Sequence, residues 1–227
     1  PPTVQFALSS SSGAESSTPA NLVVQLSTAS GLPVTVGYSV TGGTATPVDD
    51  FTLLGGGTLT FDPGDISKNV QLNIVDDLVD EPNQTVEVTL TSPTNAALGL
   101  SAVHTYTILD NDGPPTLAIS DVTQAEGNSS TTSFTFTVTK TGATEFTAGV
   151  DFATANGMTL PATGNASCGS GFDYETNTGT LSFAPADLLK TITVRVCGDV
   201  LYEANETFLV NLSNATSATI SDNQGLG

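Results

Sequence analysis

Acidic residues are concentrated in one short segment of the sequence, "VDDLVDEPNQTVEVTL" (75–90). Asp76, Asp77, Asp80 and Glu81 lie close together there, directly before a strand-like run with valine at alternate positions. Carboxylates at this spacing repel one another, raise one another's pKa values and oppose ordering of the loop that carries them. A hard cation would remove that cost, because calcium takes roughly six to eight oxygen ligands, many of them carboxylates. The segment therefore suggests a calcium site.

The whole sequence is acidic: its 227 residues include 23 Asp and Glu but only 4 Lys and Arg, giving a formal charge of −19. Because phosphate groups are bound by clustered Lys and Arg, nucleic acid and anionic membrane surfaces are disfavoured as partners. Solubility in a salty environment is the alternative explanation, and it would scatter acids over every exposed face. Acids are instead missing from several strand-like segments and gather between them, which favours discrete sites. The acid-free segments are 58–61, 70–74, 135–139 and 191–196.

Apolar and polar residues alternate in many short segments, such as "VQLNIV" (70–75), "FTFTV" (134–138) and "TITVRV" (191–196). These segments are rich in Thr, Val, Ile and Phe and are bounded by Gly, Pro, Asn or Asp, which is typical of β-strands. No segment shows helical periodicity, so the sequence predicts an all-β fold. No apolar run approaches the length of a membrane span, so direct membrane insertion is not expected.

The sequence repeats itself once. Residues 57–90 match residues 179–212 without a gap, and "PPTVQFALSSSSGAE" (1–15) matches "PPTLAISDVTQAE" (114–126) at its ends. This predicts two domains, residues 1–113 and 114–227, joined by a short proline-stiffened segment. The chain begins with Pro1, where a preceding repeat would have ended, so we expect it to be a piece of a longer tandem array.

The two repeats end differently. The first finishes with "HTYTILDND" (104–112), which predicts a final strand followed by a run of acids. The second stops at "DNQGLG" (222–227), before any counterpart of that segment. We therefore expect the second sandwich to lack its final strand, because the chain is truncated, because the strand is disordered, or because another molecule donates it. An edge left unpaired in this way invites pairing with other chains.

The acids of the first repeat should converge on one end of the fold. Successive antiparallel strands run in opposite directions, so every second loop falls at the same end. With 4–8 as the first strand, four acidic segments from distant parts of the repeat fall at one end. This convergence predicts a calcium site, and a solvated acidic rim is the alternative. The converging acids are Glu15, Asp50, the cluster 76–81, and Asp110 and Asp112.

Both acidic segments, "VDDLVDEPNQTVEVTL" (75–90) and "CGDVLYEANETFLVNL" (197–212), resemble the sequence signature of Calx-β domains. The resemblance covers both repeats and includes "AEGNSS" (125–130), "GFDY" (171–174) and "TILDND" (107–112). It implies two immunoglobulin-like antiparallel β-sandwiches, each with calcium bound at one end. The acidic positions that it implies as metal ligands are Glu15, Asp50, Asp76, Asp77, Glu81, Asp110 and Asp112, and then Glu126, Asp173, Asp199, Glu203 and Glu206.

Several positions depart from the family pattern. Gln84 stands where the family has a second Glu, and Asn111 interrupts the terminal acidic run of the first repeat. The second repeat has Gly198 in place of the first Asp of the pair, and it has no terminal acidic run. The resemblance therefore supports the first site more strongly than the second.

The two cysteines lie in the second repeat. Cys197 ends a predicted strand at the acidic end, and Cys168 lies in a loop that the first repeat lacks. Both should reach the same end, which predicts a Cys168–Cys197 disulfide and an oxidising compartment, with two free thiols as the alternative. Two cysteines and one distant histidine are too few for a zinc site.

Catalytic signatures are missing. His104 lies on a predicted strand, where we expect a surface position, and it has no local nucleophile to pair with. Paired carboxylates leave an acid/base hydrolase open as an alternative, but they occur at matching places in both repeats, and catalytic pairs rarely duplicate with a fold. The sequence therefore predicts a protein that is not an enzyme.

The leading interpretation is a calcium-binding structural or adhesive module of an extracellular or cell-surface repeat protein. Calcium at the end of the first repeat would stiffen the joint to its neighbour. The partners would be neighbouring repeats or other protein subunits, for example in a fibre or surface layer. The alternatives are an adhesin domain that binds a protein or glycan, which the scarcity of exposed aromatics disfavours, and an accessory module of a secreted enzyme.

Overall fold

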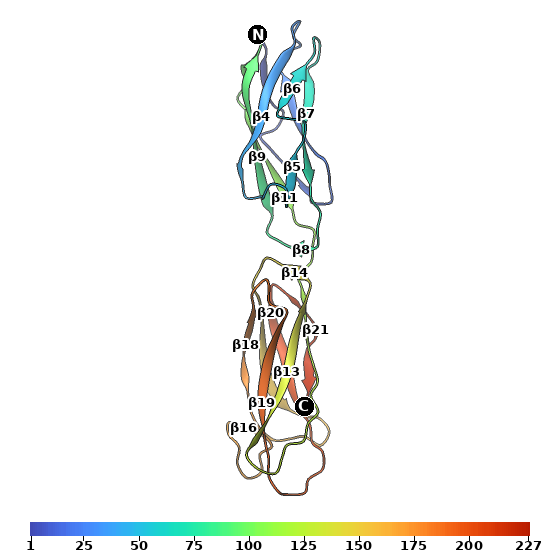
Figure 1. Cartoon of the computed structure of the whole chain (residues 1–227), viewed down its shortest axis with the longest axis vertical. Helices are drawn as coiled ribbons and strands as arrows, with labels where there is room; N and C mark the ends of the chain where they lie inside the picture. Colours follow the sequence, from blue (N-terminus) through green and yellow to red (C-terminus); the bar gives the residue numbers. More distant parts are fainter. The chain divides into compact units, whose positions relative to one another are not determined.

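The computed structural model describes all residues, 1–227, and the chain divides into two compact units. Unit 1 is Pro1–Asp112 and unit 2 is Gly113–Gly227. Each unit is built from β-strands joined by turns and loops, without α-helices (Figure 1). No helix capable of spanning a membrane is therefore present. The predicted all-β fold is confirmed.

Unit 1 is a sandwich of two five-stranded sheets, and the short strand β8 (Val79–Asp80) lies in the loop between them. In spatial order, one sheet contains β10 (Ala97–Leu98), β1 (Thr3–Phe6), β3 (Ala20–Leu26), β7 (Ser67–Ile74) and β5 (Phe51–Leu53), and the other contains β2 (Ser10–Ala14), β11 (Val103–Leu109), β9 (Gln84–Thr94), β4 (Val34–Gly43) and β6 (Thr58–Phe61).

The core of unit 1 lies between the two sheets. Every second side chain of β3 is buried, as the alternation of apolar and polar residues requires when one face of a strand packs inward. Phe6, Leu22, Phe61 and Leu72, which come from both sheets, are fully buried in one hydrophobic cluster. Removing this apolar surface from water is the main force that holds the two sheets together.

The N-terminal segment of unit 1 contributes one strand to each of the two sheets. The strand β1 pairs antiparallel with β3, and after a crossing at residues 7–9 the strand β2 pairs parallel with β11. The pairing of β2 with β11 ends with Ala14 opposite Leu109. Glu15, the next residue, is thereby carried to the end of the sandwich at which β11 finishes.

Unit 2 is also a sandwich, and the short strand β14 (Ala143–Thr144) follows its first long strand. One sheet contains β16 (Gly164–Asn165), β17 (Tyr174–Glu175), β19 (Leu189–Cys197), β13 (Thr131–Thr141), β12 (Thr116–Ile119) and β21 (Thr219–Asp222), and the other contains β18 (Thr178–Phe183), β15 (Ala148–Asn156), β20 (Phe208–Thr216) and β22 (Gln224–Leu226).

Four aromatic side chains in the core of unit 2 pack against one another. The ring of Phe208 stacks on Tyr174 at a centroid distance of 4.8 Å and meets Phe134 at 5.7 Å and Phe136 at 5.8 Å. The gap-free match between the repeats and the strand registers place Phe208 at the position of Val86, and Phe134 at that of Ala20. At these two positions, large rings in unit 2 replace a valine and an alanine of unit 1.

The expectation that unit 2 lacks its final strand needs correction. The strand β22 pairs antiparallel with β20, and Leu226 lies opposite Leu209. The corresponding pair in unit 1 is Thr105 of β11 opposite Glu87 of β9. Three residues of this strand are therefore formed, with Gly227 next to them. The prediction missed it because "QGL" has no alternating β-branched residues, and only pairing with β20 makes it a strand.

The expected surface position of His104 is wrong. Its side chain is only 2% exposed, and its ring lies 5.3 Å from that of Phe6. Because the carbonyl oxygen of Leu8 accepts only, Nδ1 of His104 donates to it at 2.7 Å, and Nε2 lies 2.8 Å from Oγ of Ser11. Alternation along β11 puts His104 in phase with the buried Tyr106, so the sequence did contain the signal.

Candidate metal centre

Three carboxylates from distant parts of unit 1 meet at one end of the sandwich. One oxygen of each of Glu15, Asp77 and Asp112 lies within 4.8 Å of the other two. Glu15 follows β2, Asp77 follows β7 and Asp112 follows β11. The convergence expected from strand direction is therefore present for these residues.

Glu15 is the most enclosed member of this acidic cluster. Its backbone amide donates to the carbonyl oxygen of Leu109 at 3.2 Å, which extends the pairing of β2 with β11 by one residue. Its side chain is 6% exposed, and Oε2 is buried without a hydrogen-bond partner. A buried acceptor without a partner costs roughly 1–3 kcal/mol, and more when it is charged. Burying Oε2 of Glu15 is therefore favourable only if another group or an ion binds this oxygen.

The run that follows β11 is ordered by hydrogen bonds among its own acids and amides. The amide of Asp110 donates to Oδ1 of Asn83 at 3.0 Å, and the amide of Asp112 donates to Oδ1 of Asp110 at 3.4 Å. Nδ2 of Asn111 donates to Oδ1 of Asp76 at 3.2 Å. Oδ2 of Asp112 remains buried without a partner. These contacts hold Asp76 and Asp110 beside the cluster.

The loop after β7 supplies further oxygen atoms. Oδ1 of Asp77 accepts from the amide of Val79 at 2.8 Å, which fixes the turn. Oε2 of Glu81 accepts from Nε2 of Gln84 at 3.0 Å, and Oε1 of Gln84 is buried without a partner. The amide oxygen of Gln84 is therefore a third buried acceptor without a partner at this end of the unit, after the carboxylate oxygens of Glu15 and Asp112.

Asp50 lies at the same end but in a different role. Its backbone carbonyl accepts from the amide of Val75 at 2.9 Å, which places it next to Asp76. Its Oδ2 accepts from the amide of Thr46, so this carboxylate closes its own turn in the structure. Asp50 is not a member of the group of three, and its assignment as a metal ligand stays a prediction.

Burial and mutual repulsion disfavour the charged forms of these acids. The pKa of Glu15 is raised to about 7, first by burial and then by the negative charges of Asp110, Asp77, Asp112 and Asp76. The pKa of Asp112 is also raised, again by burial first and then by Asp110. Without a cation, the cluster therefore opposes its own ionisation near neutral pH.

No basic side chain of the chain neutralises the cluster. Lys68 pairs with Asp65 at 2.8 Å, Lys190 with Asp187 at 2.8 Å, and Arg195 with Glu175 at 3.8 Å. The fourth, Lys140, donates to the carbonyl oxygens of Ala184 and Pro185. Since these are all the Lys and Arg residues of the sequence, any neutralising charge must come from outside the chain.

The matching acids of unit 2 are less tightly gathered. The pKa of Glu126 is raised by burial and then by Glu203, Asp199 and Asp173, and that of Glu206 is raised by burial and then by Asp173. Within residues 113–227, no three of these carboxylates meet as closely as those of unit 1. Their assignment as ligands stays a prediction.

Gly198 explains one departure of unit 2. Its amide donates to the carbonyl oxygen of Ser130 at 2.9 Å. A Cβ at this position would lie 2.8 Å from the carbonyl oxygen of Gly127 and 3.0 Å from that of Glu126. A side chain at this position would force these backbone carbonyl groups to shift, which disfavours an acid in unit 2 at the position of Asp76.

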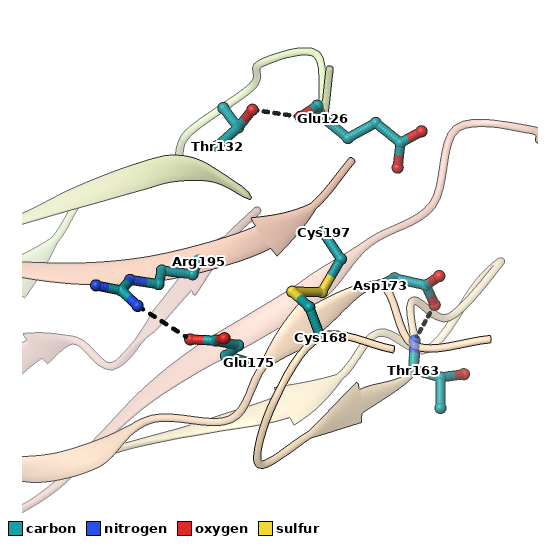
Figure 2. Close-up of a disulfide and its surroundings, with 8 residues drawn as sticks. All are labelled: Glu126, Thr132, Thr163, Cys168, Asp173, Glu175, Arg195 and Cys197. Atoms are coloured by element: carbon teal, nitrogen blue, oxygen red, sulfur yellow. Dashed lines mark hydrogen bonds and ion pairs between the residues drawn. A yellow bond between two sulfur atoms is a disulfide. The ribbon is translucent and has the colours of Figure 1, made fainter. Parts of the chain in front are cut away.

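The predicted disulfide is confirmed. Cys168 and Cys197 are bonded, with their Cα atoms 5.6 Å apart. The amide of Cys197 donates to the carbonyl oxygen of Asp173 at 2.8 Å, and Oδ2 of Asp173 accepts from the amide of Thr163. Figure 2 shows Asp173 and Thr163 together beside the disulfide. The bridge therefore anchors the loop that unit 1 lacks directly beside an acid of unit 2.

Sequence reasoning undervalued three amide side chains. Asn83 positions Asp110, Asn111 positions Asp76, and Gln84 positions Glu81. From the sequence alone, Gln84 and Asn111 are only departures from an acidic pattern. The available signal was their position, because each lies within or directly beside an acidic segment at the end of a strand.

The Calx-beta domain family matches two stretches of the chain, residues 1–112 and 115–224, one in each unit. Sodium/calcium exchanger 1 from Bos taurus is 27% identical over 210 residues, which cover 85% of this chain and 21% of the exchanger. Adhesion G-protein coupled receptor V1 from Danio rerio is 29% identical over 184 residues, which cover 80% of this chain and 3% of the receptor. The chain thus spans about a fifth of the exchanger's length and a much smaller share of the receptor's length.

Two solved structures also align with most of the chain. The calcium binding domain CBD12 of CALX1.1 shares 22% identity and a TM-score of 0.46, over 93% of this chain and 79% of that one. CBD12 from CALX1.2 shares 22% identity and a TM-score of 0.47, over 94% of this chain and 80% of that one.

Proposed function

The chain belongs to the Calx-beta domain family, and from this premise we propose that unit 1 binds calcium at Glu15, Asp77 and Asp112. The observation that carries the proposal is Oε2 of Glu15, which is buried without a partner among other carboxylates while every basic residue is engaged elsewhere. A divalent cation would meet this oxygen and remove the repulsion that raises the pKa of Glu15.

The chemistry of the donors favours calcium over other metals. The cluster offers oxygen atoms only, from carboxylates and from the amide of Gln84, whereas zinc prefers nitrogen and sulfur. Asp76, Asp110 and Glu81 surround the three central acids and can complete a coordination shell of roughly six to eight oxygens. Magnesium holds its waters tightly and uses only one or two carboxylates, which suits this crowded cluster poorly.

The bound ion would act structurally. Asp110 and Asp112 are the last acids of unit 1, and Gly113 begins unit 2. Calcium would tie this exit segment to the loop after β7 and to Glu15, so that the chain leaves unit 1 in a fixed conformation. In this role the protein is a binding module, not a catalyst, and its partners are neighbouring repeats or protein subunits.

An extracellular or cell-surface setting is part of the proposal. The Cys168–Cys197 disulfide supports it, because disulfides persist in oxidising compartments and are rare in the cytosol. Millimolar calcium in such settings also matches sites of modest affinity. Secretion by the source organism, followed by thiol titration of the protein as isolated, tests this part.

Calcium titration by calorimetry tests the site, together with melting in calcium and in chelator. A ligand at a hundredfold excess over its dissociation constant adds about 2.7 kcal/mol to the folded state, which for a domain of this size is roughly 10–20 °C. Asp77→Asn should abolish most of this shift. Asp62→Asn makes the same charge change at an exposed position outside the cluster, and should leave the shift intact. A melting curve that is unchanged by chelator would overturn the proposal.

A further inference from the structure

The first and last segments of unit 1 are bonded to each other along the length of the sandwich. The amide of Ala97 donates to the carbonyl oxygen of Pro2 at 3.0 Å, and the amide of Ser16 donates to Oδ1 of Asn111 at 3.3 Å. Between these contacts, β1 pairs parallel with β10, and β2 pairs parallel with β11 over five residues. The four residues delimit an entry segment (2–16) and an exit segment (97–111).

His104 maintains the contact where the entry segment crosses from one sheet to the other. Its Nδ1 donates to the carbonyl oxygen of Leu8 at 2.7 Å, and its Nε2 lies 2.8 Å from Oγ of Ser11. The amide of Thr105 donates to the carbonyl oxygen of Ser9 at 3.0 Å. The ring of His104 is buried, so water cannot easily replace these bonds. The crossing is therefore not a gap between the two segments.

The chain enters and leaves unit 1 at opposite ends. In β3, Leu26 lies opposite Val4, and Ala20 at the other end lies opposite Leu72. Since β7 leads from Leu72 into the acidic loop, Val4 lies at the end far from the acidic cluster. The strand β11 runs toward that cluster. Figure 1 accordingly shows the N-terminus and β8, which belongs to the acidic loop, at opposite ends of unit 1.

Tension along the chain would therefore pull the entry and exit segments past each other. The two segments run in the same direction, and the force acts on the start of one and on the end of the other. Ladder hydrogen bonds run between the strands, so this load falls on all of them together. Parallel segments pulled from the same end would instead separate one pair at a time. Resistance to force depends on the rate of unfolding, which the first arrangement lowers.

The acidic cluster lies across the same joint. Glu15 belongs to the entry segment, Asp112 directly follows the exit segment, and Asp77 follows β7. A cation held by these three carboxylates would link both segments to a third part of the sandwich. Without an ion, their mutual repulsion opposes the contact. This step rests on the proposed calcium function, whereas the backbone ladder and the bonds of His104 do not.

We propose that unit 1 bears tension along the chain. Its entry and exit segments form a clamp that is loaded in shear, and calcium strengthens this clamp at its acidic end. The unit keeps its fold under forces that would peel apart a sandwich whose first and last strands are not bonded to each other. Unit 1 is joined in series to unit 2, so any tension on the chain passes through the clamp.

Single-molecule force measurements on the whole chain test the clamp. Handles at the two chain ends load both units in series, and the length released on unfolding distinguishes the units. The Cys168–Cys197 disulfide spans a sequence separation of 29 and keeps this loop closed, which shortens the release from unit 2 by about 100 Å. Unit 1 should unfold in a single step, without partly peeled intermediates.

A second tether peels the same clamp. Ala97→Cys adds an attachment point at an exposed residue where the exit segment begins, and both native cysteines are bonded. Handles at this residue and at Pro1 pull from the same end. In chelator and at equal force, the sheared unit should unfold at least about tenfold more slowly than the peeled unit, because one further hydrogen bond broken in the limiting step gives a factor of this order. Equal lifetimes in the two geometries would overturn the clamp.

Matched proline variants locate the bonds that carry the load. The amide of Glu15 donates to Leu109, so amides at odd positions of β2 face β11 and those at even positions face away. Ser11→Pro removes a ladder donor and the hydroxyl beside His104. It should shorten the sheared lifetime at least about tenfold and the peeled lifetime much less. Ser12→Pro lies on the outward side of this edge strand and should leave both lifetimes unchanged.

Equal shortening of both lifetimes by Ser11→Pro would show general destabilisation and would contradict shear loading of this bond. The comparison of pulling geometries leaves the ladder itself unaltered, so it decides the matter even if Ser11→Pro does not fold.

Calcium at a hundredfold excess over its dissociation constant should lengthen the sheared lifetime at least about fivefold, a part of the roughly hundredfold shift in the folding equilibrium. Peeling begins far from the acidic cluster, so the peeled lifetime should change much less. Asp112→Asn should remove the calcium effect, and Asp62→Asn should keep it. Equal calcium effects in both geometries would overturn the strengthening. Absence of calcium binding by calorimetry would overturn the proposed function, while the ratio of the two lifetimes in chelator tests the clamp separately.

Discussion

The backbone amide of Glu15 donates to the carbonyl oxygen of Leu109 at 3.2 Å. This bond joins the end of β2 to the end of β11 and brings a carboxylate from the first repeat's beginning to the acids at its end. The side chain of Glu15 is buried, negatively charged when ionised, and without a hydrogen-bond partner at Oε2. The stability of unit 1 should therefore depend on what neutralises Glu15.

Replacing Glu15 should separate the energetic cost of burying its charge from its contribution to calcium binding. We expect Glu15→Gln to stabilise unit 1 in chelator at pH 8, because the neutral amide avoids burying a charge and its NH₂ group can donate to Asp77 or Asp112. The raised pKa sets the scale at about 3 kcal/mol at most. The same change should remove most of the stabilisation by calcium. Denaturant unfolding in both conditions measures this, and a variant less stable than the parent in chelator would contradict it.

The stability of the calcium-free protein should fall as pH rises from about 4.5 to about 7. Folded Glu15, with its pKa raised from 4.5 to about 7, binds a proton more tightly than the unfolded chain does, so deprotonation favours unfolding across this window. Asp112, Glu126 and Glu206 are shifted in the same direction. The lowered pKa values of acids such as Asp65 act below 3.8, outside the window.

Calcium should reverse this trend, because the ion competes with the proton on Glu15. The difference between the melting temperatures in calcium and in chelator should therefore grow from pH 5 to pH 8. Buffers of matched ionic strength are the control, since salt screens exposed charges. A chelator melting temperature that stays flat or rises between pH 5 and pH 7 would show that Glu15 is not the controlling group.

Gly198→Ala should destabilise unit 2 by roughly 1–3 kcal/mol, as other overpacked positions do. The added methyl group would press on the carbonyl oxygens of Gly127 and Glu126. Gly198→Asp should be at least as harmful and should not restore a calcium ligand. Gly169→Ala lies in the same unit, where the added Cβ would meet only Cδ2 of Phe172 at 3.8 Å, and serves as the tolerated control. Differential scanning calorimetry of the three variants decides the matter.

Loss of the Cys168–Cys197 disulfide should destabilise unit 2 by about 3 kcal/mol. The bridge closes a loop with a sequence separation of 29, and loops of this size constrain the unfolded chain by roughly that amount. The double change Cys168→Ser and Cys197→Ser, and reduction of the parent protein, should have the same effect, while unit 1 melts as before. Intact mass before and after reduction and alkylation verifies the bridge, and an unshifted unit 2 transition after reduction would refute its role.

The sequence by itself determined the fold class, the two repeats and the end of the sandwich at which the acids gather. Alternation in β3 and β9 has a period of two, so it specifies which side chains face inward without knowledge of any partner. Chain direction then places Glu15, Asp77 and Asp112 at one end. The same reasoning paired Cys168 with Cys197.

Only the tertiary structure decided which oxygens are left over and which distant segments meet. Whether Oε2 of Glu15 has a partner depends on segments about a hundred residues apart, and so does the burial of His104 under Phe6. The three residues of β22 become a strand only through pairing with β20. Local patterns specify the direction in which a side chain points, but contacts between distant segments decide whether it meets a ring or a carbonyl oxygen.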